Sequence, residues 1–433
     1  MECKDILTGD VMPVGAYYGP IISYTTKEWG GYTTENFLQD KYFQMITDCG
    51  LNVITTVDCD YADDPENFLK TMDLCEKYGI RIFVKDRELE SLEGEEAIRR
   101  RMAPYSKYKC FAGIRVIDEP ESTVFPVNTD KPNRELSFYC KVASKLNGID
   151  GLLGYVNLFP YYASMEADFG KTMADYEAYV NTYSEGVPNL KLLSWDHYVF
   201  DFNPPRYDVY FENMSVCREL ADRRNVPFWA FVQAGGQWHS ANKPSVPYFP
   251  TEGQHTWNVN TCLAMGAKGI QYFPLVQPHW FSLNENGEID SKRSGLIGAD
   301  GSATPWFYMV KQSNAQIRAV DEYLMNAVHI GVLPVGDTPK AHTKNVKSVL
   351  SGTFRELTGV DAPKEALLGC FDYKGKTALY VVNYDQEESQ TITLHFSKNC
   401  EYETICAQDR EKMAGDACTF TLGKGGAKLI LIG

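Results

Sequence analysis

The stretch that decides the fold is Cys110–Pro120, CFAGIRVIDEP, a short apolar run that ends abruptly in two carboxylates and a proline. The apolar residues of 111–117 are typical of a strand buried in a parallel sheet. Because proline cannot extend a central strand, Pro120 fixes where this one ends. Asp118 and Glu119 then lie at the C-terminal tip of the strand, where α/β barrels hold their catalytic residues. For an isolated DEP, the start of a solvated loop is the preferred interpretation. The position of this strand among eight is what favours a catalytic role.

Alternating strand and helix patterns continue on both sides of this stretch. The predicted strands are 13–19, 52–58, 80–85, 111–117, 152–159, 190–195, 227–233 and 269–273. The predicted helices are 41–50, 66–78, 95–105, 134–146, 172–183, 207–224, 251–265 and 306–325. Eight strand–helix units predict an α/β protein with a (β/α)8 TIM barrel over residues 1–328, rather than a doubly wound sheet. No GxGxxG or Walker pattern follows a strand, so we expect no nucleotide chemistry and no cofactor.

After residue 328 the helical periodicity disappears. Runs at 366–373 and 377–383 flank the turn Lys374-Gly375-Lys376, which is a hairpin signal, and short alternating runs follow at 391–396, 419–422 and 428–432. This pattern predicts a small antiparallel β-sandwich over residues 329–433. It contains no catalytic constellation, so we expect it to cover barrel surface, with glycan binding as a weaker alternative.

Composition limits the partners and the compartment. The net charge of −15 argues against nucleic acid and anionic membranes, and no apolar run is long enough to span a bilayer. Aromatic residues make up 13% of the chain, which suits a cleft that stacks against sugar rings. The 12 cysteines show no CxxC spacing, so we expect free thiols in a reducing compartment and no metal.

The first residues lack the apolar core of a signal peptide, so a cytoplasmic location is expected. A secreted protein whose leader has been removed would look the same. The sequence gives no indication of the oligomeric state.

The C-terminal tips of barrel strands converge on one site, so the residues there predict its chemistry. These tips carry carboxylates, amides and aromatic rings, but no serine nucleophile motif. In strand order the candidates are Tyr18, Asp58, Asp118, Glu119, Asn157, Asp196, His197, Tyr198, Gln233, Trp238 and Tyr272. Glycoside hydrolysis needs two carboxyl groups, together with polar and flat groups that hold a sugar. We therefore predict a glycoside hydrolase that uses Glu119 and a second carboxylate, with the remaining candidates binding the carbohydrate; Trp238 is the expected sugar platform.

Three stretches resemble clan A glycoside hydrolases, particularly the barrel β-galactosidase-like group, over roughly residues 10–330. Glu119-Pro120 is similar to that clan's Asn-Glu-Pro acid/base motif, with Asp118 in place of the asparagine. Residues 227–233, PFWAFVQ, resemble its strand seven, which usually ends in a nucleophilic glutamate, and residues 264–273, AMGAKGIQYF, resemble its strand eight. The resemblance implies that Glu119 is the acid/base and that Asp118 can accept the hydrogen bond of the sugar 2-hydroxyl.

Gln233 departs from this pattern, because an amide is a poor nucleophile. Asp196 could supply the second carboxylate, since strands four and six are the catalytic pair in the α-galactosidase clan; we prefer this explanation. Alternatively, Gln233 replaces a catalytic glutamate in an engineered variant made to trap substrate, or the chain only binds glycans, in which case Asp196 would merely cap its loop. The runner-up function is therefore a non-catalytic or inactivated carbohydrate-binding barrel. A barrel aldolase or lyase would need a Schiff-base lysine, for which Lys85 is the candidate.

Overall fold

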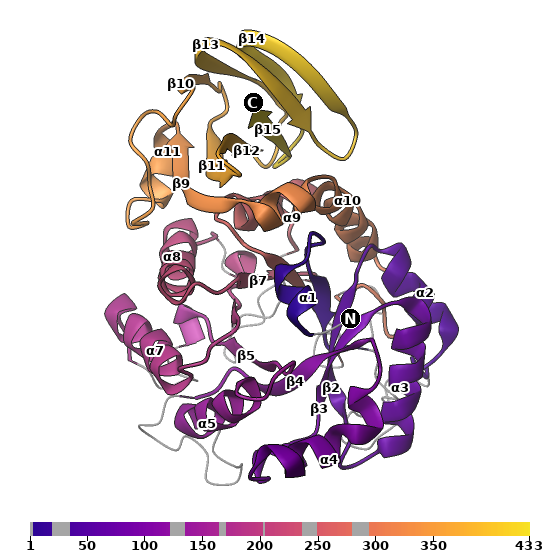
Figure 1. Ribbon diagram of the computed structural model, residues 1–433. Helices are drawn as coiled ribbons and strands as arrows, with labels where there is room; N and C mark the ends of the chain where they lie inside the picture. Colours follow the sequence, from indigo (N-terminus) through magenta and orange to yellow (C-terminus); the bar gives the residue numbers. More distant parts are fainter. Residues whose placement is uncertain are drawn as a thin grey trace.

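The structure is a computed structural model in which eight parallel strands form a closed barrel and a second, antiparallel sheet lies at one end of the molecule (Figure 1). It describes residues 3–19, 35–121, 135–163, 170–201, 204–235, 249–278 and 294–433. The predicted fold class, a (β/α)8 TIM barrel followed by a small antiparallel β-sandwich, is confirmed.

The barrel strands pair in the order of the sequence. They are β1 Val14–Tyr17, β2 Val53–Asp60, β3 Arg81–Lys85, β4 Phe111–Asp118, β5 Gly154–Leu158, β6 Leu193–Trp195, β7 Phe228–Gln233 and β8 Gly269–Phe273. The ring closes because β1 pairs with β8, with Gly15 opposite Gln271. All C-terminal strand ends therefore face the same side of the molecule.

Helices surround the barrel, and capping residues in the sequence mark where several of them begin and end. They are α2 Asp40–Asp48, α3 Pro65–Tyr78, α4 Glu95–Ser106, α5 Leu136–Asn147, α7 Met173–Gly186, α8 Tyr207–Arg224, α9 Glu252–Ala264 and α10 Pro305–Asn326, and the short α1, Cys3–Thr8, precedes β1. In α3, the Asp64 side chain accepts a hydrogen bond from the backbone of Asn67, and Gly79 ends the helix with φ 66°. In α9, Thr251 and Gln254 form a capping box.

Large side chains fill the interior of the barrel, and small residues make room for them. The Trp229 indole lies over Gly269, where an added Cβ would be 2.6 Å from the ring. The rings of Phe83 and Tyr155 stack beside it, with centroids 4.8 Å apart. The middle of the barrel is therefore a packed core.

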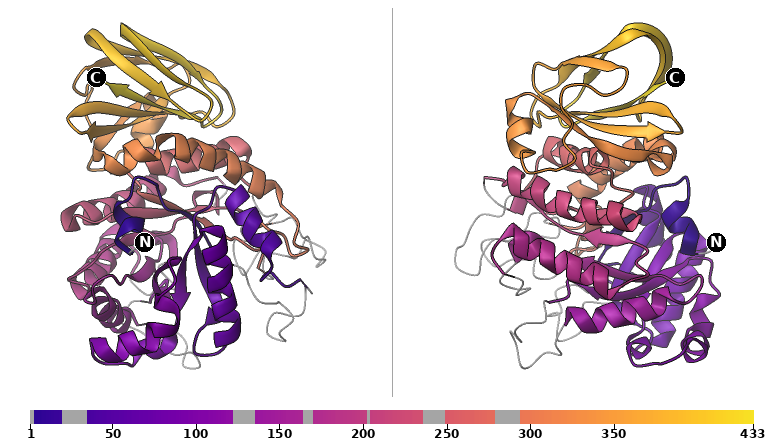
Figure 2. Two further views of the ribbon diagram at one scale, coloured as in Figure 1. Left: turned by 45° about the vertical axis from the view of Figure 1, so that its right-hand side comes forward. Right: turned by 60° about the vertical axis from the view of Figure 1, so that its left-hand side comes forward.

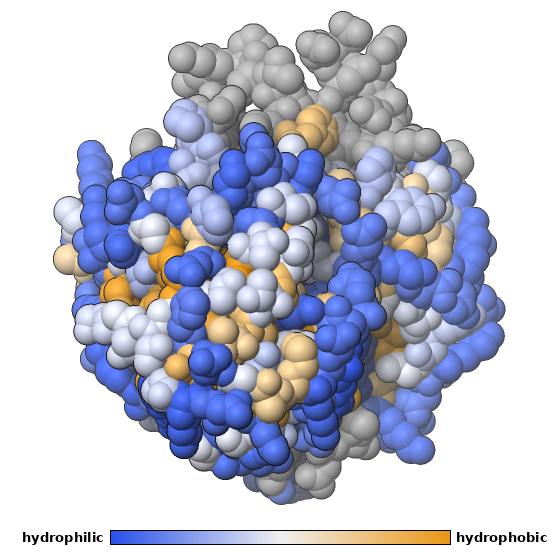
Figure 3. All heavy atoms as spheres, turned by 90° about the horizontal axis from the view of Figure 1, so that it is seen from above, coloured by the Kyte–Doolittle hydropathy of each residue, from blue (hydrophilic) through white to orange (hydrophobic). Residues whose placement is uncertain are grey.

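The C-terminal sheet has the order β10-β13-β15-β12-β11-β9, with β14 paired to β13. Its strands are β9 Val328–Val335, β10 Leu357–Asp361, β11 Ala366–Tyr373, β12 Lys376–Asn383, β13 Gln390–Ile405, β14 Arg410–Leu422 and β15 Ala427–Ile432, and the short α11, Asp337–His342, follows β9. Strands β13 and β14 are much longer than the runs predicted for them. The additional residues include exposed charged side chains such as Glu401 and Lys412. Hydrophilic residues predominate on the face seen from this end of the molecule (Figure 3).

The inner strands of this sheet pack on two sides. Leu368, Leu379 and Ile430 face the outer strands in a core of their own, whereas Leu367 and Leu429 belong to the same core as the barrel. Both views in Figure 2 show the sheet lying on the side of the barrel formed by α9 and α10. The sheet therefore covers the apolar faces of these helices.

Polar contacts fix the sheet against α9. The Tyr380 hydroxyl donates to Asn260 Oδ1 at 2.7 Å, and Asn260 Nδ2 donates to the Gly425 carbonyl at 2.9 Å. A Cβ at Gly369 would lie 2.4 Å from the carbonyl oxygen of Ala264, so only glycine allows this approach. The C-terminal sheet is therefore packed directly against helix α9 of the barrel.

Lys268, just before β8, caps the end of α10. Its amine donates to the carbonyls of Leu324, Met325 and Ala327, the last at 2.6 Å. Because these carbonyls have no partner within the helix, we expect Lys268→Met to lower the free energy of unfolding by about 1.5–3 kcal/mol. Denaturant unfolding of the variant, beside Lys70→Met on the exposed face of α3, checks this. Equal stability of the two variants would contradict the capping role.

Candidate active site

A chain of hydrogen bonds rises through the barrel to its mouth and orients Asn157. The hydroxyls of Tyr155 and Ser194 lie 2.9 Å apart, and Ser194 donates to Asn157 Oδ1 at 2.9 Å. The Asn157 amide nitrogen is thereby turned toward Asp118 Oδ1, to which it donates at 3.2 Å. Three neighbouring strands, β4, β5 and β6, thus contribute to one polar cluster.

The tip of β4 departs from regular strand geometry. The pairing of β4 with β5 shifts by one residue between Arg115 and Ile117, which is a β-bulge that redirects the side chains after it. Glu119 then adopts a left-handed conformation, with φ 52°. Its amide donates to the Asn157 carbonyl at 2.9 Å. A non-glycine residue in this conformation costs about 1–3 kcal/mol, and such residues cluster at functional sites.

The redirected Glu119 meets Asp196, which follows β6. The two carboxyl groups share a hydrogen bond, and Asp196 is buried, with 4% of its surface exposed. Burial raises the pKa of Asp196 well above its ordinary value, and the charge of Asp118 raises the pKa further. Two carboxyl groups can share a hydrogen bond only when one of them is protonated. Burial and the charge of Asp118 therefore oppose ionisation of both carboxyls together, so the site favours a pair that holds one proton.

Basic side chains lie on the other side of Asp118. Arg115 Nη1 is 3.4 Å from the Tyr17 hydroxyl, and this hydroxyl is also hydrogen-bonded to Asp118. Lys85 Nζ lies 3.9 Å from Asp60 Oδ2. Burial and then the positive charge of Arg115 lower the pKa of Lys85. One side of the mouth therefore holds the carboxyl pair. The other side holds the basic side chains of Arg115 and Lys85 together with the acid Asp60.

Gln233 is occupied by the backbone. Its Oε1 accepts from the amide of Phe200 at 3.1 Å, and its Nε2 donates to the Gly235 carbonyl at 3.1 Å. The side chain is buried, and it joins the loops that follow β6 and β7. A glutamine fits this place because the position needs both an acceptor and a donor.

The aromatic candidates fall in different places. Tyr198 is buried at the mouth: its ring lies 5.9 Å from that of Phe273, and its pKa is raised by burial and then by the charge of Asp196. Tyr272 faces the helical layer instead, where its hydroxyl donates to Asn314 on α10 at 2.9 Å. Tyr18 follows β1 with φ 66° and is buried.

His197 also points away from the mouth. Its Nδ1 is 2.8 Å from Asn213 Oδ1 on α8, and this oxygen accepts from the Tyr161 amide as well, so Nδ1 carries the proton. Burial lowers the pKa of His197 to about 4, and the ring is therefore neutral. The Asp58 side chain and Trp238 lie outside the described residues.

Sequence reasoning missed two charged residues at the mouth. Arg115 lies within the apolar run of β4, and its only signal is a charge at an inward-facing position of a buried strand. Glu90 lies in a short 3-10 helix, Arg87–Glu90, that no periodicity announces. Burial raises the pKa of Glu90, and the charge of Lys85 opposes that change.

Searches for other kinds of site were limited to the described residues. Within them, no three histidine, cysteine or acidic side chains are grouped as metal ligands. The cysteines of these ranges are free thiols, nearly all buried. In the same part of the chain, no helix combines the length and apolar character required to cross a bilayer.

No protein-family model matches the chain, and no curated protein matches it. Solved structures similar to it include a protein of Bacteroides thetaiotaomicron provisionally described as an α-L-fucosidase, with 14% identity, 62% of this chain and 88% of that chain covered, and a TM-score of 0.43. Another is a glycoside hydrolase family 30 subfamily 8 xylanase of Clostridium acetobutylicum, with 8% identity, 98% and 96% coverage and a TM-score of 0.46. A third is a glycoside hydrolase with 11% identity, 99% and 96% coverage and a TM-score of 0.43. At these identities, the function of this chain has to be inferred from its own site.

The contacts of Gln233 predict the effect of a carboxylate there. Gln233→Glu would keep the bond from Phe200 but would place an acceptor against the Gly235 carbonyl, so we expect a loss of about 1–3 kcal/mol in the free energy of unfolding. Denaturant unfolding beside Gln312→Glu, on the exposed side of α10, measures the effect. A stable Gln233→Glu variant that gains glycosidase activity absent from the parent would instead identify an inactivated enzyme.

Proposed function

We propose that this chain is a glycoside hydrolase in which Glu119 is the general acid/base and Asp196 is its carboxyl partner. The observation that supports this most is the contact between these two carboxyl groups at the mouth of a TIM barrel, where burial raises the pKa of Asp196. Glu119 is only partly buried, whereas Asp196 lies beneath it, so Glu119 is the member that can reach a bound substrate. A carboxyl group that stays protonated near neutral pH is what protonation of a glycosidic oxygen requires.

In this proposal, the bound glycoside takes the place of the hydrogen bond between the two carboxyls. Glu119 gives the shared proton to the leaving oxygen as the bond from that oxygen to the anomeric carbon breaks. Both carboxyls are then ionised, and their negative charge stabilises the positive charge that develops on the sugar ring. Glu119 recovers its proton from the water molecule whose oxygen bonds to the anomeric carbon, which returns the pair to its starting state.

The surrounding groups suit a carbohydrate. Asp118 and Asn157 offer an acceptor and a donor beside the carboxyl pair, and Tyr17 offers a hydroxyl. The rings of Tyr17 and Tyr198 lie 6.2 Å and 5.9 Å from that of Phe273, so together they form an aromatic wall. Such a wall can pack against the apolar face of a sugar.

A barrel that binds carbohydrate without cleaving it is the second candidate. The observation in its favour is Gln233, which is neutral and fully engaged where the resembling clan has a nucleophile. The two candidates share the binding groups and differ only in whether the carboxyl pair turns substrate over.

Turnover of aryl glycosides separates the candidates. On a substrate that the parent cleaves, we expect Glu119→Gln to lower kcat/KM by about 10²–10⁴-fold, since it removes the proton donor. Glu96→Gln, a change of the same kind on the exposed surface of α4, should leave the rate unchanged. Full activity of Glu119→Gln would refute the assignment, and a parent that binds sugars but cleaves none would be a binding barrel.

The raised pKa of Asp196 predicts a pH dependence of stability. Above the ordinary carboxyl pKa values, about 3.9 for Asp and about 4.3 for Glu, both carboxyls of the unfolded chain are ionised while the folded pair keeps one proton, so folding becomes less favourable as pH rises, by up to about 1.4 kcal/mol per pH unit. This slope should be absent from Asp196→Asn. Thermal unfolding of parent and variant between pH 4.5 and 7.5 should therefore show the variant gaining relative stability with pH. A difference that stays constant with pH would contradict a shared proton.

A further inference from the structure

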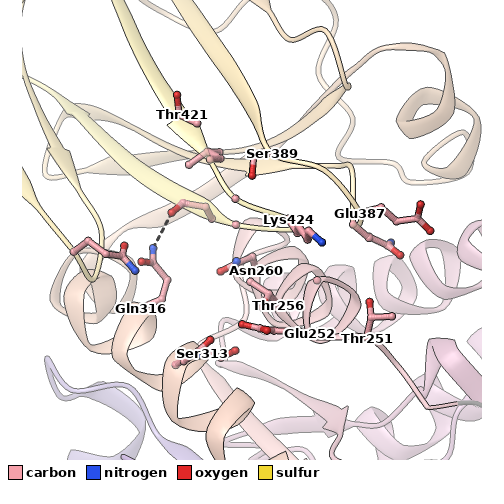
Figure 4. Close-up of a pocket in the computed structure, with 18 residues that line it drawn as sticks. Thr251, Glu252, Thr256, Asn260, Ser313, Gln316, Glu387, Ser389, Thr421 and Lys424 are labelled. Carbon is pink, nitrogen blue, oxygen red and sulfur yellow. Dashed lines mark hydrogen bonds between the residues drawn. The ribbon is translucent and has the colours of Figure 1, made fainter.

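A second cleft lies outside the barrel, between its helices and the C-terminal sheet. Its walls are α9, α10 and the loops that join β12 to β13, β13 to β14 and β14 to β15 (Figure 4). Its volume is about 960 Å³, which is at the upper end of the range for small-ligand sites. The candidate active site uses none of its residues.

The chemistry of the cleft is polar and nearly neutral. Of its 18 lining residues, ten carry a side-chain amide or hydroxyl, and three are charged: Glu252, Glu387 and Lys424. The net charge of the lining is therefore −1, which does not favour an anionic ligand. Amide and hydroxyl groups can donate and accept, as recognition of many hydroxyls requires.

Part of this lining is rigid, and part is unused. Gln316 donates to the Ala427 carbonyl at 3.2 Å and accepts from the Ala407 amide at 2.9 Å, so it holds the sheet in place. Within the described part of the chain, Gln312 and Gln408 make no hydrogen bond. The Ser313 hydroxyl is buried, at 5% exposure of the residue, and has no partner among those residues. The cleft therefore has one side held by Gln316, and its lining offers the side chains of Gln312 and Gln408 as hydrogen-bonding groups for a ligand.

Two exposed aromatic rings lie on or beside α9 and α10, outside the lining of the cleft. Tyr308, in the first turn of α10, is 60% exposed and lies one turn before Gln312, on the same face of the helix. Phe249, just before α9, is 42% exposed, and its ring stacks 6.5 Å from that of Trp306. Tyr308 is thus one helical turn from a residue of the lining, within reach of a ligand that contacts Gln312.

We propose that this cleft is an accessory binding site for a neutral oligosaccharide. The unused amides would bind sugar hydroxyls, and Tyr308 would pack against a sugar ring. Because α9 and α10 begin at the mouth side of the barrel, a bound chain would lie close to the candidate active site. The role of the cleft in holding a long substrate rests on the proposed function, but the binding itself does not depend on turnover.

The test is a double variant, Tyr308→Ala with Gln312→Ala, in the full-length chain. Both residues are exposed and form none of the contacts that fix the sheet, so folding should be unaffected. The probes are cellohexaose, xylohexaose and β-1,4-galactohexaose, titrated calorimetrically in a Glu119→Gln background that prevents turnover. We expect the affinity for at least one hexasaccharide to fall about tenfold, because a stacking contact and a hydrogen bond are lost.

Phe138→Ala with Lys141→Ala on α5 is the matched control, since Phe138 is a similarly exposed ring, 41% exposed, on another helix. This control should bind as the parent does. The cleft variant, with Glu119 intact, should keep the parent's kcat/KM on an aryl monosaccharide. Absence of binding to all three hexasaccharides, or equal binding by the cleft variant, overturns the proposal. Cleft-dependent binding in a chain that cleaves no glycoside would refute the hydrolase and leave the accessory site standing.

Discussion

Closure of the barrel by the pairing of β1 with β8 is the constraint on which the rest of the molecule depends. It brings residues that are far apart in sequence, such as Tyr17 and Asp196, to one mouth. It also leaves the interior to Trp229 and its neighbours, which fill the space below that mouth. Polar groups can be buried at the mouth because the packed layers beneath keep them in fixed positions.

Several acidic side chains lie close together at the mouth, and each of them is hydrogen-bonded to another side chain of the site. Asp118 is hydrogen-bonded to Asn157 and Tyr17, and the carboxyls of Glu119 and Asp196 are hydrogen-bonded to each other. Each partner is oriented by a further hydrogen bond, such as that from Ser194 to Asn157. Because these partners lie on β4, β5 and β6, the position of each acid depends on the neighbouring strands.

The sequence was sufficient to place the barrel, because eight strand–helix units leave few other topologies. It was also sufficient to bring Asp118, Glu119, Asn157 and Asp196 together, since strand order alone determines which tips are neighbours. It could not show which residues face inward: Tyr272 and His197 lie near tips but point toward the helices. The partners of Gln233 are backbone groups, which no side-chain pattern reveals. Residues 410–414 of β14 are all exposed, so no apolar alternation marks them as a strand.

In the proposed function, the residue that donates the proton, Glu119, has a backbone conformation that lowers the stability of the fold. Its left-handed conformation is one that glycine adopts without cost, so the fold alone would favour glycine at the end of β4. Under the proposed function, selection for a stable fold and selection for a proton donor act in opposite directions on this residue. Homologues that do not need this carboxylate should more often have glycine at position 119. Their barrels should have a higher free energy of unfolding.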